Sequence, residues 1–221
     1  YDVVPSSSAI VDRKNGKVQY PTSATTLTPT GTRTARIVVG GDGFCDSGSV
    51  RLMFTINNLD TGKDLKFWSG PWGAWSTVRL LSQGREIERL ELYGRHHELF
   101  GFQLLPFNEQ WTEAAVTGLH GSFDTNLGQL QPLVGKIEKG ERAVVMHKLH
   151  MSLFESKKIL PLRFCPLEIE LSLAPAGYWI DNLSTSNGST TYSTNYSISD
   201  LRVIYDEVVP DDSIVSSFYA G

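Results

Sequence analysis

The chain has little cysteine, no excess of basic charge and no long apolar run. Its two cysteines, Cys45 and Cys165, allow at most one disulfide bond, and a chain of 221 residues can bury a sizeable core without one. We therefore expect both thiols to be reduced and buried. The 20 basic and 24 acidic residues give a net charge of -4, which disfavours direct nucleic-acid binding. No run of about 18 apolar residues is present, so no transmembrane segment is expected.

The sequence also lacks an initiator methionine and a charged leader followed by an apolar stretch, and we expect a fragment or a processed product. Residues 1–33 are rich in Ser, Thr and Pro and have few apolar side chains to bury. This composition predicts an extended N-terminal arm or a peripheral strand. Because such arms usually bind a partner surface, Val3, Val4 and Ile10 are candidate interface residues.

Alternating apolar and polar residues predict antiparallel strands over residues 34–209. The runs are TARIVV from residue 34, VRLMFTINN from 50, AVVMHKLHMSLF from 143, ILPLRF from 159, LEIELSL from 167 and ISDLRVIYDEVV from 198. With the hairpin described next, they make about eight strands. The predicted fold is all-β, an eight-stranded antiparallel jelly-roll sandwich. An immunoglobulin-like sandwich is disfavoured because the Cys-Trp-Cys framework is missing.

Residues 76–99, STVRLLSQGREIERLELYGRHHEL, change period within one stretch. Two alternating runs flank Gln83-Gly84, which predicts a tight hairpin. From Tyr93 the spacing suits a helix, with His96, His97 and Phe100 on one face. We therefore expect a helical insertion over 93–105, inside a long inter-strand excursion over 93–141.

The loop KFWSGPWGAW, residues 66–75, gathers three tryptophans around glycine and proline. It has two interpretations. The tryptophans either cap one end of the sandwich or face a neighbouring subunit, or else Trp68, Trp72 and Trp75 form a stacking platform for sugar rings or bases. The second interpretation gives the alternative function, a carbohydrate-binding β-sandwich module.

Catalytic and metal-binding patterns are weak. His96, His97, His120, His147 and His150 lie among acidic residues, but neighbours on a helix diverge and strand residues three apart face opposite sides. Glu168 and Glu170 share a strand face, as a glycosidase pair could, yet a solvent-facing or interface stripe explains them better. No nucleophile elbow or phosphate-binding loop is present. We expect no enzyme activity, no metal and no cofactor.

Three blocks in order resemble the first jelly roll of double jelly-roll major capsid proteins, a group that spans nucleocytoplasmic large DNA viruses, virophages and Polinton or adintovirus-like elements. They are VRLLSQGREIERLELYGRHHELF from residue 78, HKLHMSLFESKKILPLRFCPLEIELSL from 147 and SDLRVIYDEVVPDD from 199. In the first block, the family pattern matches Val78, Leu80, Gly84, Ile87, Glu88, Tyr93, Gly94, Glu98 and Leu99.

The resemblance implies a structural subunit of the virion, assembled inside the host cell. It implies a homotrimer that forms a pseudo-hexameric capsomer of an icosahedral shell and contacts neighbouring capsomers, with penton and minor capsid proteins as further partners. Residues 34–209 would be the first jelly roll and 210–221 the connector to a second, absent roll.

Candidate interface residues besides the arm are Trp68, Trp72, His96, His97 and Phe100. Loss of one loop aromatic, as in Trp72→Ala, is expected to impair assembly more than folding. The polar stretch 181–197 holds three glycosylation triplets, at Asn182, Asn187 and Asn195, although such triplets also arise by chance in Ser- and Asn-rich loops.

Overall fold

The computed structural model describes residues 10–103, 106, 117, 123–124, 129–130, 136–156, 158–180, 192–211 and 216. Its strands are β1 (Ile10–Gln19), β2 (Thr26–Leu27), β3 (Thr34–Val39), β4 (Phe44–Asp46), β5 (Arg51–Asn58), β6 (Leu65–Lys66), β7 (Trp75–Ser82), β8 (Arg85–Glu91), β9 (Phe123–Asp124), β10 (Gln129–Leu130), β11 (Lys136–Ile137), β12 (Arg142–Lys148), β13 (Ile159–Leu160), β14 (Leu167–Leu173) and β15 (Tyr196–Pro210). Its helical segments are η2 (Ser47–Ser49), η3 (Pro71–Ala74), α1 (Tyr93–His96), η4 (His97–Gln103), α3 (Ser152–Glu155) and η5 (Ala176–Tyr178).

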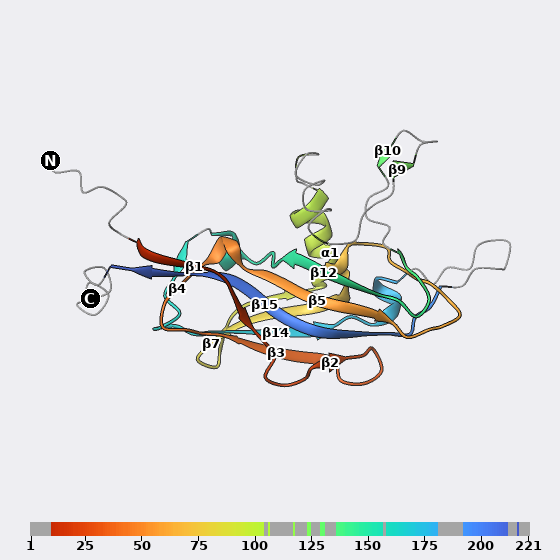
Figure 1. Cartoon of the computed structure of the whole chain (residues 1–221), viewed down its shortest axis with the longest axis horizontal. Coiled ribbons are helices and arrows are strands. Elements are labelled where there is room, and N and C mark those ends of the chain that lie inside the picture. Colours follow the sequence, from red (N-terminus) through yellow and green to blue (C-terminus); the bar gives the residue numbers. More distant parts are fainter. Residues whose placement is uncertain are drawn as a thin grey trace.

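The longer strands form two antiparallel sheets packed face to face (Figure 1). One sheet contains β12, β5, β15 and β1 as neighbours, and the other has the order β3-β14-β7-β8. The pairs are nested: β7 pairs with β8, β5 with β12, β3 with β14 and β1 with β15. Nested pairs that alternate between two sheets are the topology of a jelly roll. The predicted eight-stranded jelly-roll sandwich is confirmed.

The core lies between the two sheets, where alternate residues of each strand point inward. In β3, Ala35, Ile37 and Val39 are buried while the residues between them are exposed. They meet side chains from the opposite sheet, such as Leu52 and Phe54 of β5. Period-2 alternation therefore sets which face of each strand is apolar, as the sequence pattern predicts.

The β7–β8 hairpin turns at the predicted dipeptide. Gln83 and Gly84 have positive φ angles of 49° and 79°, as a two-residue type I′ turn requires. The strand β8 ends at Glu91. Leu92, the N-cap residue of α1, has a φ of 53° and turns the chain into that helix. The predicted helical insertion is present: α1 and the π-helical η4 run on from Tyr93 to Gln103 and project from the sandwich (Figure 1).

Residues 10–19, inside the predicted arm, form the peripheral strand β1 along β15. Three ion pairs fix this edge: Arg13 with Asp46 and Asp206 at 2.9 and 2.8 Å, and Lys17 with Glu207 at 2.6 Å. Ile10 pairs with Pro210, so the start of β1 and the end of β15 lie together at the left of Figure 1. The sequence predicted either an extended arm or a peripheral strand here, and residues 10–19 form a peripheral strand. The domain limits at residues 33 and 209 stay a prediction.

Three local expectations are wrong. The strand predicted over 143–154 ends at Lys148, and residues 152–155 form the short helix α3. The strand predicted over 159–164 is only two residues long, because the chain turns at Pro161. Both cysteines are free, as expected, but only Cys45 is buried, whereas Cys165 is exposed beside Ser82.

The start of α1 packs directly on η3. A Cβ atom placed on Gly94 would lie 2.7 Å from Cα of Gly73 and 3.2 Å from the carbonyl oxygen of Trp72. Two backbones approach this closely only where one residue has no side chain. Gly94 therefore sets the distance between the helical insertion and the sandwich.

We predict that Gly94→Ala lowers the free energy of unfolding by about 1–2 kcal/mol, because the clash exceeds the gain in helix propensity. Chemical denaturation followed by tryptophan fluorescence measures the change. Gly177→Ala in η5 is the matched control, since no atom lies within 4 Å of its added Cβ. Equal stability of the two variants would contradict the close contact.

Candidate functional site

Three loops meet at one end of the sandwich, and we call this region the loop end. It consists of residues 59–74, 92–103 and 174–180. The amide of Trp68 donates to the carbonyl oxygen of Trp179 at 2.8 Å, and Phe67 and Ile180 form an isolated β-bridge. The Phe67 and Trp179 rings stack with centroids 4.5 Å apart. Backbone and ring contacts therefore hold the first and third loops together.

The buried side chain of Trp72 connects the first loop to the helical insertion. Its side chain is 1% exposed and stacks on the His97 ring at 4.4 Å. Its indole Nε1 donates to Glu98 Oε2 at 2.7 Å. Tyr93, also buried, accepts a hydrogen bond from the amide of His150 at 3.0 Å. The insertion is thus tied to both η3 and the segment after β12.

The three tryptophans of the loop do not form one platform. Trp75 is buried and packs edge-on against Phe54 at 5.3 Å, and Trp72 is buried beneath η4. Trp68 alone among the three is exposed, at 54%. Trp72 and His97 therefore support the loop end from beneath, and a partner or sugar could reach only Trp68.

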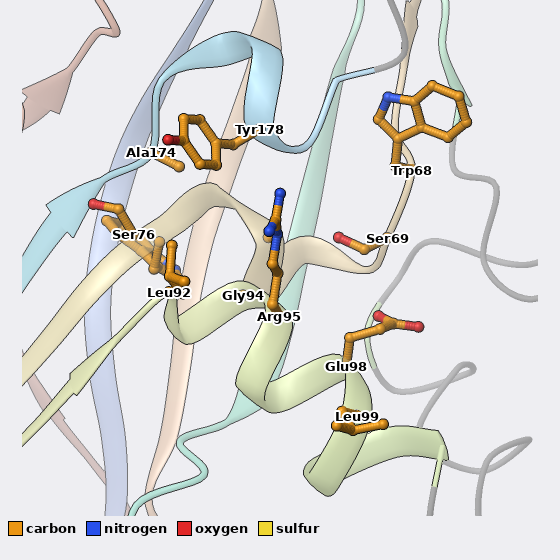
Figure 2. Close-up of a pocket in the computed structure, with 12 residues that line it drawn as sticks. Trp68, Ser69, Ser76, Leu92, Gly94, Arg95, Glu98, Leu99, Ala174 and Tyr178 are labelled. Carbon is orange, nitrogen blue, oxygen red and sulfur yellow. The ribbon is translucent and has the colours of Figure 1, made fainter.

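A pocket of about 360 Å³ opens at the loop end between the three loops (Figure 2). Its lining includes Trp68, Gly94, Arg95, Glu98 and Tyr178. The Arg95 guanidinium lies over the Tyr178 ring, 5.7 Å from the centroid, and Figure 2 shows it pointing into the space between Tyr178 and Trp68. Sequence reasoning missed Arg95 and Tyr178 because nothing local links the helix to residues near 178.

Four histidines gather at the base of the insertion. The His97 ring lies 5.4 Å from the His147 ring and 5.8 Å from the His150 ring, and His96 lies 5.4 Å from His150. The expectation that His147 and His150 share one strand is wrong, because β12 ends at Lys148. His150 lies beyond the strand end, where its ring reaches those of His96 and His97. This cluster joins η4 to the end of β12.

One carbonyl oxygen fixes the tautomers of the two buried rings. His97 Nε2 and His147 Nδ1 lie 3.1 and 2.9 Å from the carbonyl oxygen of Lys148. A carbonyl only accepts, so both nitrogens must carry hydrogen. In the neutral rings, His97 Nδ1 and His147 Nε2 then carry no hydrogen. Neither nitrogen has a hydrogen-bond partner in the described part of the chain.

The cluster favours neutral imidazoles. Burial lowers the pKa of His147 to about 4. Burial, followed by the nearby His147, lowers the pKa of His97 well below its usual value. By contrast, the hydrogen bond from His150 lowers the pKa of Glu155 to about 2, and Lys148 also pairs with this carboxylate at 2.8 Å. The charged groups, Lys148 and Glu155, therefore lie beside the cluster, whereas the buried rings of His97 and His147 are neutral.

The described residues contain neither a metal-binding group of side chains nor a carboxylate pair placed for glycosidase chemistry at Glu168 and Glu170. No group of three or more His, Cys, Asp or Glu side chains there could hold a metal ion. Glu170 accepts hydrogen bonds from Arg36 and Arg79 at 2.9 and 2.6 Å. Burial opposes ionisation of Glu170, but these arginines lower its pKa on balance. A carboxylate held by two arginines is a structural ion pair rather than a proton donor.

The remaining predicted site residues divide into two groups. Phe100 is 50% exposed on η4, His96 is half-buried against it, and Asn195 is exposed, as a modified asparagine must be. Ile10 begins β1 opposite Pro210. Val3, Val4, Asn182 and Asn187 lie outside the described residues.

We predict that Trp72→Ala lowers the free energy of unfolding by about 3–5 kcal/mol, since it empties a buried site. This reverses the expectation from sequence that assembly would suffer first. The matched control is Trp68→Ala, which should cost about 0.5 kcal/mol because its ring is half exposed. Thermal and denaturant unfolding of both variants test the difference, and equal losses would contradict the assignment.

Stability should fall on acidification. The pKa of His147 is about 4 when folded and about 6.5 when unfolded, so below pH 6.5 the unfolded chain binds more protons. The stabilisation is present above that pH and is lost as the pH falls toward 4, at up to about 1.4 kcal/mol per pH unit. We predict that His147→Phe, which keeps an aromatic ring, reduces the slope of the free energy of unfolding against pH by up to about 1.4 kcal/mol per pH unit. Denaturation curves from pH 7 to 4 measure it, and an unchanged slope would contradict the burial of a neutral ring.

Comparisons with known proteins find the likeness in structure alone. No family model matches the sequence, and no curated protein matches it. The PBCV-1 virus capsid contains a chain that superposes with a TM-score of 0.50 and 14% identity, over 94% of this chain and 44% of the other. The Sputnik virophage structure gives a TM-score of 0.52 and 15% identity, over 96% and 51%.

The chain therefore spans about half the length of the solved chains it matches. At this level of identity the likeness concerns the fold. The structural likeness agrees with the jelly-roll topology of the nested strand pairs. It also agrees with the resemblance of the three sequence blocks that start at residues 78, 147 and 199. The resemblance predicted from sequence is confirmed at that level: the chain has the jelly-roll fold of the viral double jelly-roll major capsid proteins.

Proposed function

We propose that this protein is a viral major capsid subunit that self-associates into homotrimeric, pseudo-hexameric capsomers of an icosahedral shell. The observation that carries the proposal is the likeness of nearly the whole chain to one part of two virus capsid chains. The nested sandwich would supply the rigid body of the subunit. Contacts between copies would then come from side chains that the sandwich leaves exposed.

Exposed apolar side chains at the loop end support a contact role for this region. Trp68, Leu92, Leu99, Phe100 and Tyr178 are each about half exposed. They lie on the three loops that the contacts described above hold together. Large apolar side chains grouped on a surface mark an interaction site more often than scattered ones do.

The outer face of the β3-β14-β7-β8 sheet has a different character. Arg36, Glu170, Arg79 and Glu86 form a continuous chain of ion pairs across the four strands, with distances of 2.6–2.8 Å. Covering the exposed charges of this network with another subunit would cost desolvation energy. We therefore assign the first contacts between subunits to the loop end.

The finer parts of the proposal follow the resemblance. The chain would be the first of two jelly rolls, with residues 210–221 leading to the second, and it would act in the virion after assembly inside the host cell. Penton and minor capsid proteins would be further partners, and we assign no catalytic role. No helix in the described part of the chain has the length and apolarity needed to cross a membrane.

We predict that Trp68→Ala and Phe100→Ala each weaken trimer formation by about tenfold or more, because interface aromatics contribute a large share of binding energy. Mass photometry and sedimentation velocity over a range of protein concentrations measure the assembly. Val144→Ala is the matched control, since Val144 is also half exposed but lies on β12. If both aromatic variants assemble as the wild type does, the loop end is not the interface.

A further inference from the structure

The loop-end pocket combines two features that the fold itself does not require. Its sides carry two aromatic rings, Trp68 at 54% exposure and Tyr178 at 55%. Between them stands the guanidinium of Arg95 (Figure 2). We propose that this pocket is a binding site for an acidic sugar, a pyranose that carries a carboxylate. This inference goes beyond the proposed function, since it concerns one pocket of a single subunit.

The two rings suit the faces of a sugar. A pyranose presents weakly positive C–H groups on its flat faces, and the face of an aromatic ring is negative. Trp68 comes from the loop after β6 and Tyr178 from η5, and the Trp68 amide donates to the carbonyl oxygen of Trp179. Because this backbone contact ties the two segments together before any ligand binds, part of the entropic cost of binding is already met.

Arg95 selects for a carboxylate. Its side chain is exposed on α1, and it makes no ion pair with a carboxylate in the described part of the chain. A guanidinium offers paired N–H donors that match a carboxylate group. The contact with the Tyr178 ring orients Arg95 toward the pocket without neutralising its charge.

Hydroxyl groups of the sugar would find polar partners along the same wall. Glu98 lies one helical turn beyond Arg95, and its Oε2 is anchored by the Trp72 indole at 2.7 Å. Ser69 also lines the pocket. A volume of about 360 Å³ lies at the lower end of the range for small-molecule sites, which fits one or two sugar rings.

The test compares methyl β-glucuronide with methyl β-glucoside, which differ only in a carboxylate against a hydroxymethyl group. We expect the purified protein to bind the glucuronide with a millimolar dissociation constant and the glucoside about tenfold more weakly. Calorimetric titration gives both constants, and saturation-transfer NMR identifies the sugar protons that contact the rings.

Variants assign the binding to this pocket. Arg95→Gln should remove the preference for glucuronide, and Tyr178→Ala should weaken both sugars. Tyr20→Ala is the matched control because Tyr20 is 60% exposed and lies outside the pocket. Melting temperatures of all three variants should equal that of the wild type, since each changed side chain is exposed. Assembly measured on Arg95→Gln separates this inference from the proposed function, because this variant keeps every exposed apolar side chain of the loop end. Sugar selectivity should fall while trimers still form.

Four results would overturn the inference. They are no binding of either sugar, equal binding of both, competition by acetate as strong as that by glucuronide, and binding of N-acetyl-tryptophanamide in place of glucuronide. Acetate competition would indicate a general anion site. Preference for the tryptophan amide would indicate a site for an aromatic side chain of another protein.

Discussion

The loop end depends on the contact between the helical insertion and η3. Gly94 rests on the backbone of Gly73, Trp72 stacks on His97, and the Trp72 indole holds Glu98. These contacts place Arg95 on the side of the helix that faces Tyr178. If this contact opened, the pocket would lose the wall that α1 and η4 supply. The contact is buried, so its strength comes from close packing and desolvated hydrogen bonds rather than from surface charge.

The sandwich beneath supplies the rigidity that this contact needs. The nested pairs bring the start and the end of the described chain together as β1 and β15, and Glu207 is buried at that edge under Lys17. Ion pairs run along the β1–β15 edge and across the β3-β14-β7-β8 sheet, whereas the loop end exposes the rings of Trp68, Phe100 and Tyr178. An exposed aromatic surface beside a charged one is compatible with the proposed self-association.

Much of the fold could be predicted from sequence, because local patterns determine it. Alternation located β3, β5, β7, β8 and β14, and Gln83-Gly84 located the hairpin turn. The strand β1 was harder to recognise, because its Arg13 and Lys17 pair with Asp206 and Glu207 at the other end of the chain. The site was harder still. Three tryptophans within eight residues look alike in sequence, but tertiary contacts bury two of them and leave Trp68 exposed. The histidine cluster was missed because its members meet only where β12 ends.

The central claim is that this jelly roll is a self-assembling shell subunit. A cryo-electron microscopy reconstruction of the particles formed by the purified protein tests it most directly. We expect units with threefold symmetry and a pseudo-hexagonal outline, in which each sandwich stands roughly perpendicular to the shell and the loop ends of neighbouring subunits touch. A protein that stays monomeric at every concentration, or particles whose subunits do not meet through the loop end, would contradict this account.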